Sequence, residues 1–175
     1  MKYLLLFFSV CYSLNTLCQE LSIGDATVVD KIKTNTSQIY DTKDKTYFFL
    51  TKEPLRQTQT SATNITAHTY NDSVNRVIAI SITDKGQLAT EWYFLNNKLI
   101  FAFESFEYFT ESDEQTGYKN FKGFEAYESR YYFVNEFIKY QKHKGRKDLD
   151  GNQEALKVLK DGNTVLKYIT ENIKK

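Results

Sequence analysis

The chain has 175 residues, of which 41% are hydrophobic and 15% aromatic, so it can bury one proper core but is too short for two comfortable domains. Its 23 Lys and Arg residues nearly balance its 22 Asp and Glu residues. This balance argues against nucleic acid or an anionic membrane as the main partner, because both bind a positively charged face. One Pro and seven Gly exclude collagen-like chains and proline-rich disorder.

The N-terminal segment from Met1 to Cys18 resembles a secretory signal peptide. Lys2 supplies a positive start, Leu4 to Val10 form an apolar run, and Thr16-Leu17-Cys18 is a small-x-small exit. The apolar run is far shorter than the roughly 20 residues of a bilayer span, so we expect no transmembrane helix in the mature chain. We predict a signal peptide over residues 1–18, one domain over 19–175, and export to the periplasm or the extracellular space.

A lipid anchor is the alternative for this segment, with Cys18 retained and acylated. The preceding Asn15-Thr16-Leu17 fits the usual Leu-small-small lipobox poorly.

Both cysteines, Cys11 and Cys18, lie in the segment, so cleavage after Cys18 leaves no thiol, disulfide or thiolate metal site. Loss of Lys2 also makes the mature chain formally neutral.

The first elements after this segment are a helix and a short apolar run. Ala26 to Tyr40 has helical spacing, with Gly24-Asp25 in front as a cap. Tyr47 to Leu50 reads as a short strand or a buried turn, stopped by Pro54. The apolar stripe of the helix consists of Val28, Val29, Ile32, Ile39 and Tyr40.

A tight β-hairpin is predicted for Ala89 to Ser105. Tyr93-Phe94 and Leu99 to Phe103 are the aromatic and branched residues that pack well on a pleated surface. Asn tolerates positive φ, so Asn96-Asn97 suits the two-residue type I′ turn. The two strands are apolar on both faces at their centres, which predicts at least partial cover on each side of the sheet.

This hairpin pattern recurs. Glu128 to Tyr140 aligns on the first copy with Asn135 over Asn96 and with no residue for Lys98. A weaker third copy consists of Thr66 to Tyr70, Asn71-Asp72-Ser73 and Val77 to Ile82. Hairpins in series favour an antiparallel meander, whether they reflect internal duplication or simply the usual composition of hairpins.

The predicted fold class is α+β: an antiparallel β-meander of about six strands with an N-terminal helix and a C-terminal helix packed on the sheet. The last helix starts near Asn152, with Asp150 or Asn152 as its cap. Asp161-Gly162-Asn163 disfavours helix, so we expect a kink or a break there. The expected strands are Ile65–Tyr70, Val77–Thr83, Leu88–Phe94, Leu99–Ser105, Ala126–Phe133 and Phe137–Lys142, and the apolar stripe of the last helix is Leu156, Leu159, Leu166, Ile169 and Ile173.

Few residues suggest catalysis or metal binding. His68 and His143 are the only histidines, and no nucleophile elbow accompanies either of them. The run from Asp148 to Glu154 is similar to the middle of a calcium loop, but Lys157 stands where the bidentate Glu belongs. We therefore expect no catalytic triad, no metal site and no cofactor.

A long loop from Glu107 to Lys122 interrupts the meander, and long loops often carry function. It is acidic first and then rich in aromatic residues, which suits contact with a protein or a glycan. The basic run Lys142 to Lys147 is interpreted as a solvated loop, with phosphate or acidic polysaccharide as its alternative ligand. The predicted binding residues are Tyr108, Glu111, Asp113, Glu114 and Tyr118.

The strings E-W-Y-F-L-N-N-K-L-I-F, from Glu91 to Phe101, and R-Y-Y-F-V-N, from Arg130 to Asn135, resemble the hairpins of a family of exported bacterial proteins of unknown function. Those hairpins read roughly E-x-Y-Y-F-x-N-G-K-L-I-F and later R-Y-Y-F, and the resemblance covers about Thr63 to Tyr140. Asn97 stands where that pattern prefers Gly. The central hairpin is also similar to MORN-like and YwqK-type antitoxin repeats, but their regular Gly spacing is missing here. The resemblance implies no catalytic residues.

Two functional hypotheses follow from the sequence. The first is an exported, non-enzymatic binding or interaction module with a protein or glycan partner. The second is a secreted hydrolase or inhibitor-type protein that uses carboxylates near the central hairpin. The second requires a concave pocket that contains two of Glu91, Glu104 and Glu128, at least one of them with a raised pKa.

Overall fold

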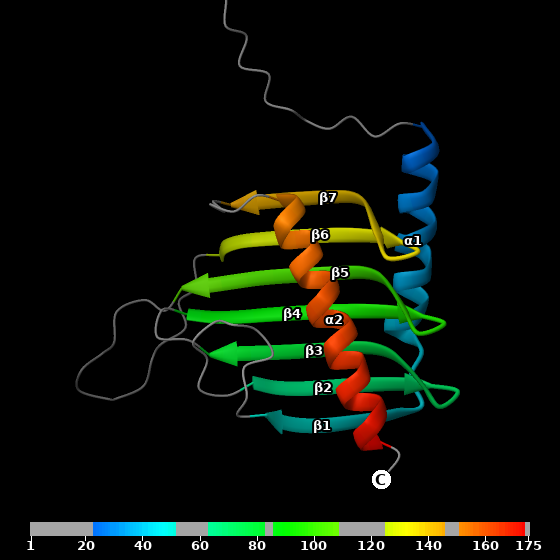
Figure 1. Ribbon diagram of the computed structural model, residues 1–175, viewed down its shortest axis with the longest axis vertical. Coiled ribbons are helices and arrows are strands. Elements are labelled where there is room, and N and C mark those ends of the chain that lie inside the picture. Colours follow the sequence, from blue (N-terminus) through cyan, green and yellow to red (C-terminus); the bar gives the residue numbers. More distant parts are fainter. Residues whose placement is uncertain (1–22, 52–62, 83–85, 109–124, 146–150, 174–175) are drawn as a thin grey trace, which may run out of the picture.

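The computed structural model describes residues 23–51, 63–82, 86–108, 125–145 and 151–173. Within these residues, seven strands form one antiparallel sheet whose spatial order equals their order in the chain (Figure 1). Two helices flank the sheet, α1 (Ile23–Asp41) and α2 (Gly151–Ile173). The strands are β1 (Lys45–Thr51), β2 (Thr63–Tyr70), β3 (Ser73–Ile82), β4 (Gly86–Leu95), β5 (Lys98–Tyr108), β6 (Glu125–Val134) and β7 (Phe137–Gly145). The predicted α+β meander is confirmed, with seven strands where about six were expected.

The additional strand is β1, which forms one edge of the sheet. It pairs with β2, and Tyr47 lies opposite Ala67. Successive side chains alternate between the two faces. Tyr47 and Phe49 are therefore half-buried on one face, whereas Phe48 and Leu50 are exposed on the other.

Three hairpins share one turn, and this explains why the meander is regular. Both turn residues have positive φ in every case, as a type I′ turn requires, so the predicted Asn96-Asn97 turn is confirmed. The backbone twist of this turn matches the right-handed twist of the flanking strands. The φ values are 49° and 58° at Asn71 and Asp72, 52° and 60° at Asn96 and Asn97, and 50° and 68° at Asn135 and Glu136.

Each of these hairpins also has a β-bulge at the same place. The register shifts between His68 and Thr69 in the β2–β3 pair, and at the equivalent positions of the β4–β5 and β6–β7 pairs. One residue on the second strand is thereby left without a partner across the ladder. That residue is Asn75 in β3, Ile100 in β5 and Lys139 in β7.

Two details of the predicted repeat are wrong. Phe137 pairs with Val134 as Lys98 pairs with Leu95, so the copy at β6–β7 has a residue at the position of Lys98. Ser73 pairs with Tyr70 and opens β3, so it does not belong to the turn. In both places the two-residue turn decides the alignment.

Helix α2 crosses one face of the sheet (Figure 1). Trp92 is 2% exposed beneath it, and its indole Nε1 donates a hydrogen bond to the backbone oxygen of Val158 at 3.1 Å. A Cβ on Gly162 would lie 2.7 Å from the Trp92 ring atom Cδ1. The helix therefore approaches the sheet more closely than any residue with a side chain would allow.

The expected break in α2 is wrong because of this contact. The helix runs without interruption through Gly162, whose packing against Trp92 offsets the roughly 1 kcal/mol helix penalty of Gly. In the predicted apolar stripe only Leu156 is wrong, since it is 63% exposed, whereas Leu159, Leu166, Ile169 and Ile173 pack on the core. The fully buried residues of α2 are Ala155, Val158, Val165 and Ile169. Asn152 lies inside the first turn rather than at the cap, and Asp150 lies outside the described residues.

Helix α1 lies against the opposite face, at the end of the strands where the hairpin turns lie (Figure 1). Val29 and Ile32 are buried there against Tyr132. The helix begins at Ile23, so the predicted cap at Gly24-Asp25 is wrong, and Asp25 belongs to the first turn. The expectation that both faces are at least partly covered is confirmed.

Candidate functional site

A cavity of about 460 Å³ lies at the hairpin end of the sheet. Three parts of the chain enclose it: the C-terminal half of α1 with the residue after it, the β2–β3 hairpin and the β4–β5 hairpin. Its volume falls in the range of small-molecule sites, roughly 300–1,000 Å³. The lining residues are Asn35, Gln38, Ile39, Thr42, Tyr70, Asn71, Ser73, Val74, Asn75, Phe94, Leu95 and Asn96.

The link from α1 to β1 fastens one wall of the cavity. The backbone N–H of Asp44 donates to the Thr69 oxygen at 2.8 Å, and the Asp44 carboxylate accepts from the backbone N–H of Asn71 at 2.7 Å. Lys45 and Asp72 form an exposed ion pair at 3.4 Å beside the same turn. These contacts hold the β2–β3 turn against the end of α1.

Asn75, the bulge residue of β3, is the most buried amide in the lining. It is 8% exposed, and its Nδ2 donates to the backbone oxygen of Thr42 at 3.0 Å. Its Oδ1 is buried and has no hydrogen-bond partner among the described residues. A buried acceptor without a partner costs about 1–3 kcal/mol.

The cavity lining is electrically neutral. None of its residues is Asp, Glu, Lys, Arg or His. Five amide side chains supply hydrogen-bond donors and acceptors, while Tyr70 and Phe94 supply aromatic surface. Tyr70 is 44% exposed, whereas Phe94 is 2% exposed.

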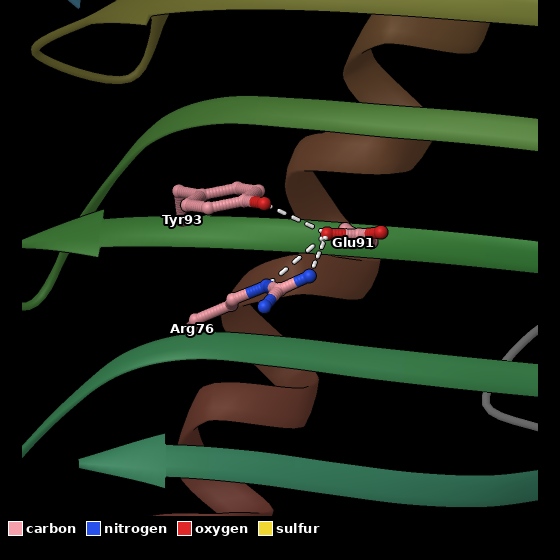
Figure 2. Close-up of polar contacts among 3 residues, drawn as sticks. All are labelled: Arg76, Glu91 and Tyr93. Atoms are coloured by element: carbon pink, nitrogen blue, oxygen red, sulfur yellow. Dashed lines mark hydrogen bonds and ion pairs between the residues drawn. The ribbon is translucent and has the colours of Figure 1, made fainter. Parts of the chain in front are cut away.

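A charged cluster of Arg76, Glu91 and Tyr93 lies on the α1 face of β3 and β4 (Figure 2). Arg76, which follows Asn75, donates through Nε and Nη2 to Glu91 Oε2 at 3.1 and 2.7 Å. The Tyr93 hydroxyl donates to the same oxygen at 2.8 Å. The Arg76 guanidinium also lies over the Tyr40 ring of α1, 4.6 Å from its centroid.

This cluster fastens α1 to the sheet and has the features of a structural contact. Burial, followed by the hydrogen bond to Glu91, raises the pKa of the Tyr93 hydroxyl far above its ordinary value, so it stays a donor. One Arg charge meets one Glu charge here, so the cluster adds no net charge beside the cavity.

The three candidate carboxylates are not brought together in a pocket. Glu91 lies on the α1 face of β4, whereas Glu104 lies on the α2 face of β5, where it is 0% exposed and accepts from the Tyr127 hydroxyl at 2.9 Å. Glu128 shares the α1 face and is ion-paired with Arg130 at 2.7 Å. Its strand and that of Glu91 are separated by β5, which places the two backbones roughly 10 Å apart. None of the three lines the cavity at the hairpin end.

The two histidines lie apart, on opposite faces of the sheet. His68 is buried on the α1 face beside the Thr46 hydroxyl, 3.0 Å from its Nδ1, and burial, with the nearby Arg76 and Lys43 charges, lowers its pKa. His143 lies 2.8 Å from the hydroxyl of Ser129, which is fully buried. No group of three or more His, Cys, Asp or Glu side chains in the described part of the chain is placed to hold a metal ion.

The predicted binding residues fall almost entirely outside the described part of the chain. Glu111, Asp113, Glu114 and Tyr118 lie in the undescribed range 109–124, and Tyr108 is the last residue of β5, where it pairs with Gly86. These residues stay a prediction. The basic run is described only as far as Gly145, at the end of β7.

Sequence reasoning missed the cavity because its residues come from segments far apart in the chain. The sequence did mark Asn71 and Asn96 as turn residues, and both of them line the cavity. The bulge that buries Asn75 follows from the pairing of two strands, and the sequence alone does not display it.

No protein-family model matches the chain, and neither the search of curated proteins nor that of solved structures found a match. Neither of the two described helices is long and apolar enough to cross a membrane.

Proposed function

We propose that the protein is an exported, non-enzymatic binding module that holds a neutral, hydrogen-bonding ligand in the cavity at the hairpin end. The observation that carries this proposal is the lining: five amide side chains and no Asp, Glu, Lys, Arg or His around a space of about 460 Å³. Amides bind polar groups in both directions because each has two N–H donors and an oxygen acceptor.

The same lining argues against turnover at this position. General acid–base and nucleophilic catalysis require a titratable group within hydrogen-bond reach of the substrate. Tyr70 is the only titratable residue of the lining. A ligand held there meets hydrogen-bonding and apolar groups but no base that would activate a nucleophile at neutral pH.

Export is part of the proposal and is supported by the sequence. Lys2, the apolar run Leu4 to Val10 and the exit at Cys18 are typical of a signal peptide. An exported protein meets neutral polymers of the cell envelope and the surroundings, and this fits a neutral binding site.

The test is a binding screen with two classes of neutral probe, short saccharides and peptides with blocked ends. The variant Gln38→Trp fills the cavity from an exposed position on α1, and Lys31→Trp places the same side chain on α1 outside the lining. We expect saturable binding of at least one neutral probe by the wild type and by Lys31→Trp, measured by titration calorimetry, and its loss in Gln38→Trp. Binding that survives in Gln38→Trp, or binding of charged probes alone, would contradict the proposal.

The same probes separate a binding module from the second hypothesis, a hydrolase. Probes recovered after long incubation should have unchanged masses. A cleaved product that disappears in Glu91→Gln or Glu128→Gln would instead support carboxylate chemistry on the α1 face.

A further inference from the structure

We infer that the ligand of this cavity is a neutral saccharide. The inference rests on the proposed function and names the chemical class that the lining fits best. Its basis is the combination of five amide side chains, a lining without charged residues, and a partly exposed aromatic ring, that of Tyr70.

The exposed amides of the lining determine which groups the ligand must offer. Asn75 shapes the lining instead, because its Nδ2 donates to the Thr42 backbone oxygen at 3.0 Å and its Oδ1 is buried. A sugar hydroxyl donates one hydrogen bond while its oxygen accepts others. One hydroxyl can therefore donate to the oxygen of one lining amide and accept from the N–H of another, for example Gln38 and Asn35.

The apolar part of the lining fits the other half of a sugar ring. Tyr70 offers an exposed ring at the rim, and Ile39, Val74 and Leu95 add aliphatic surface. A pyranose presents a face of C–H groups that packs on an aromatic ring, while its hydroxyls point to the sides. Aromatic side chains with large contact area and few rotatable bonds suit such packing.

Charged ligands fit poorly. The lining has no Lys or Arg, and the guanidinium of Arg76, the residue after Asn75, is already engaged by Glu91 and stacked on Tyr40. A phosphate or carboxylate in the cavity would be desolvated without a counter-charge, which is costly. Neutral sugars are therefore favoured over uronic acids, sialic acids and phosphorylated sugars.

A peptide fits less well for a geometric reason. Sheets usually bind extended peptides along a free edge strand, where main-chain groups pair in a ladder. The edges of this sheet are β1 and β7, whereas the cavity is enclosed by α1 and the turns of the β2–β3 and β4–β5 hairpins. No strand edge runs along it.

The experiment uses an immobilised panel of neutral mono- to tetrasaccharides built from hexoses and N-acetylhexosamines, alongside end-blocked neutral peptides. We expect one saccharide to bind, with binding lost in Gln38→Trp and weakened about tenfold in Tyr70→Ala, the equivalent of about 1.4 kcal/mol. Tyr70→Phe keeps the ring and should retain the affinity. Phe48→Ala removes another exposed ring, which lies outside the lining on β1, and is the matched control. A thermal unfolding scan verifies that each variant is folded.

The outcomes separate the two proposals. If only a blocked peptide binds, and Gln38→Trp abolishes that binding, the saccharide assignment is overturned while the proposed binding module stands. If a saccharide binds equally well to the wild type, Gln38→Trp and Tyr70→Ala, both proposals fail at this cavity. If no neutral probe of either class binds, both are overturned as well.

Discussion

The two faces of the sheet are built differently, although the same strands provide both. The α2 face is a largely apolar core that also buries Glu104; Trp92 is 2% exposed there, and Gly162 brings the helix against the ring. The α1 face is covered at the hairpin end, and it mixes aromatic rings with the Arg76–Glu91 pair. Farther along the strands it leaves Phe48 78% exposed. The comparison teaches that one face stabilises the fold, while the proposed binding site lies where α1 meets the hairpin turns.

The largest effect is expected at the centre of the α2 face. Trp92→Ala should lower the free energy of unfolding by about 3–5 kcal/mol, because it opens a cavity and removes the hydrogen bond to Val158. That is a large share of the 5–15 kcal/mol typical of a whole domain. Urea denaturation followed by fluorescence or circular dichroism measures it.

A smaller substitution, at Gly162, tests why α2 lies so close to Trp92. Gly162→Ala gains roughly 1 kcal/mol of helix propensity but forces a Cβ to 2.7 Å from Trp92, an overpacking that costs about 1–3 kcal/mol, so we expect net destabilisation. In a Trp92→Phe background the smaller ring should reduce the loss. Thr164→Ala on the exposed side of α2 is the control and should be neutral or stabilising. A stabilised Gly162→Ala protein would disprove the close-packing account.

The second prediction concerns the charged pair on the α1 face. Arg76→Met should cost about 1–3 kcal/mol, because it leaves the largely buried Glu91 carboxylate without its counter-ion and with the Tyr93 hydroxyl as its remaining partner in the cluster. The double variant Arg76→Met with Glu91→Met should recover part of the loss, since no charge is then left without its counter-ion. Unfolding free energies for the four proteins form a double-mutant cycle.

An exposed pair on α1 provides the control. Lys33 and Asp30 lie 3.0 Å apart, with side chains 58% and 72% exposed. Lys33→Met should change the unfolding free energy by less than about 0.5 kcal/mol. Equal losses at Arg76 and Lys33 would show that the α1-face cluster contributes no more than a surface ion pair.

The repeated hairpins were predictable because their information is local. Asn96-Asn97 and the flanking apolar runs determine turn, register and strand direction within a short stretch, and the structure confirms that turn. The prediction of a helix break at Gly162 was wrong for the opposite reason. Its helical state depends on packing against Trp92, which is distant in sequence, and local helix propensity does not reflect that contact.

The candidate site was less predictable than the fold. The cavity arises where α1 and two hairpins meet, and the burial of Asn75 depends on a bulge. Composition pointed instead to the loop around Glu111 and Tyr118, which lies outside the described residues and stays a prediction. Glu91 and Glu104, two of the carboxylates that the hydrolase hypothesis placed in one pocket, lie on opposite faces of the sheet.

The third prediction is a pH dependence that belongs to the α1 face. Burial lowers the pKa of His68 below its ordinary value near 6.5, with further lowering by Arg76 and Lys43 and an opposing effect of Glu91. Below pH 6.5 the unfolded chain binds a proton at this position before the folded chain does. Stability contributed by neutral His68 is thus present above pH 6.5 and declines as the pH falls toward the lower, folded-state value.

The variant His68→Gln should flatten the unfolding free energy between pH 8 and pH 5.5 relative to the wild type. His143→Gln removes the other imidazole, which is exposed on the α2 side, and serves as the control. An NMR titration of the imidazole C–H signals measures the lowered pKa directly. A His68 signal that titrates at or above the ordinary value would exclude this contribution.

The smallest effect is expected on the uncovered part of the α1 face. Replacing both Phe48 and Leu50 by Thr, which is well accepted in strands, should change the unfolding free energy by no more than about 0.5 kcal/mol, since the two side chains are 78% and 62% exposed. Denaturant unfolding measures the change, and the loss of two exposed apolar groups should also reduce aggregation on heating.

The adjacent residue provides the sharpest control for the comparison of the two faces. Phe49 lies on the same strand but points to the α2 face, where its ring meets Tyr168 edge-on with centroids 6.0 Å apart. Phe49→Thr should therefore cost about 1–3 kcal/mol, although it is chemically the same substitution as Phe48→Thr. If Phe48→Thr were as costly as Phe49→Thr, that part of the α1 face would be covered in solution, and the assignment of one face to stability and the other to binding would fail.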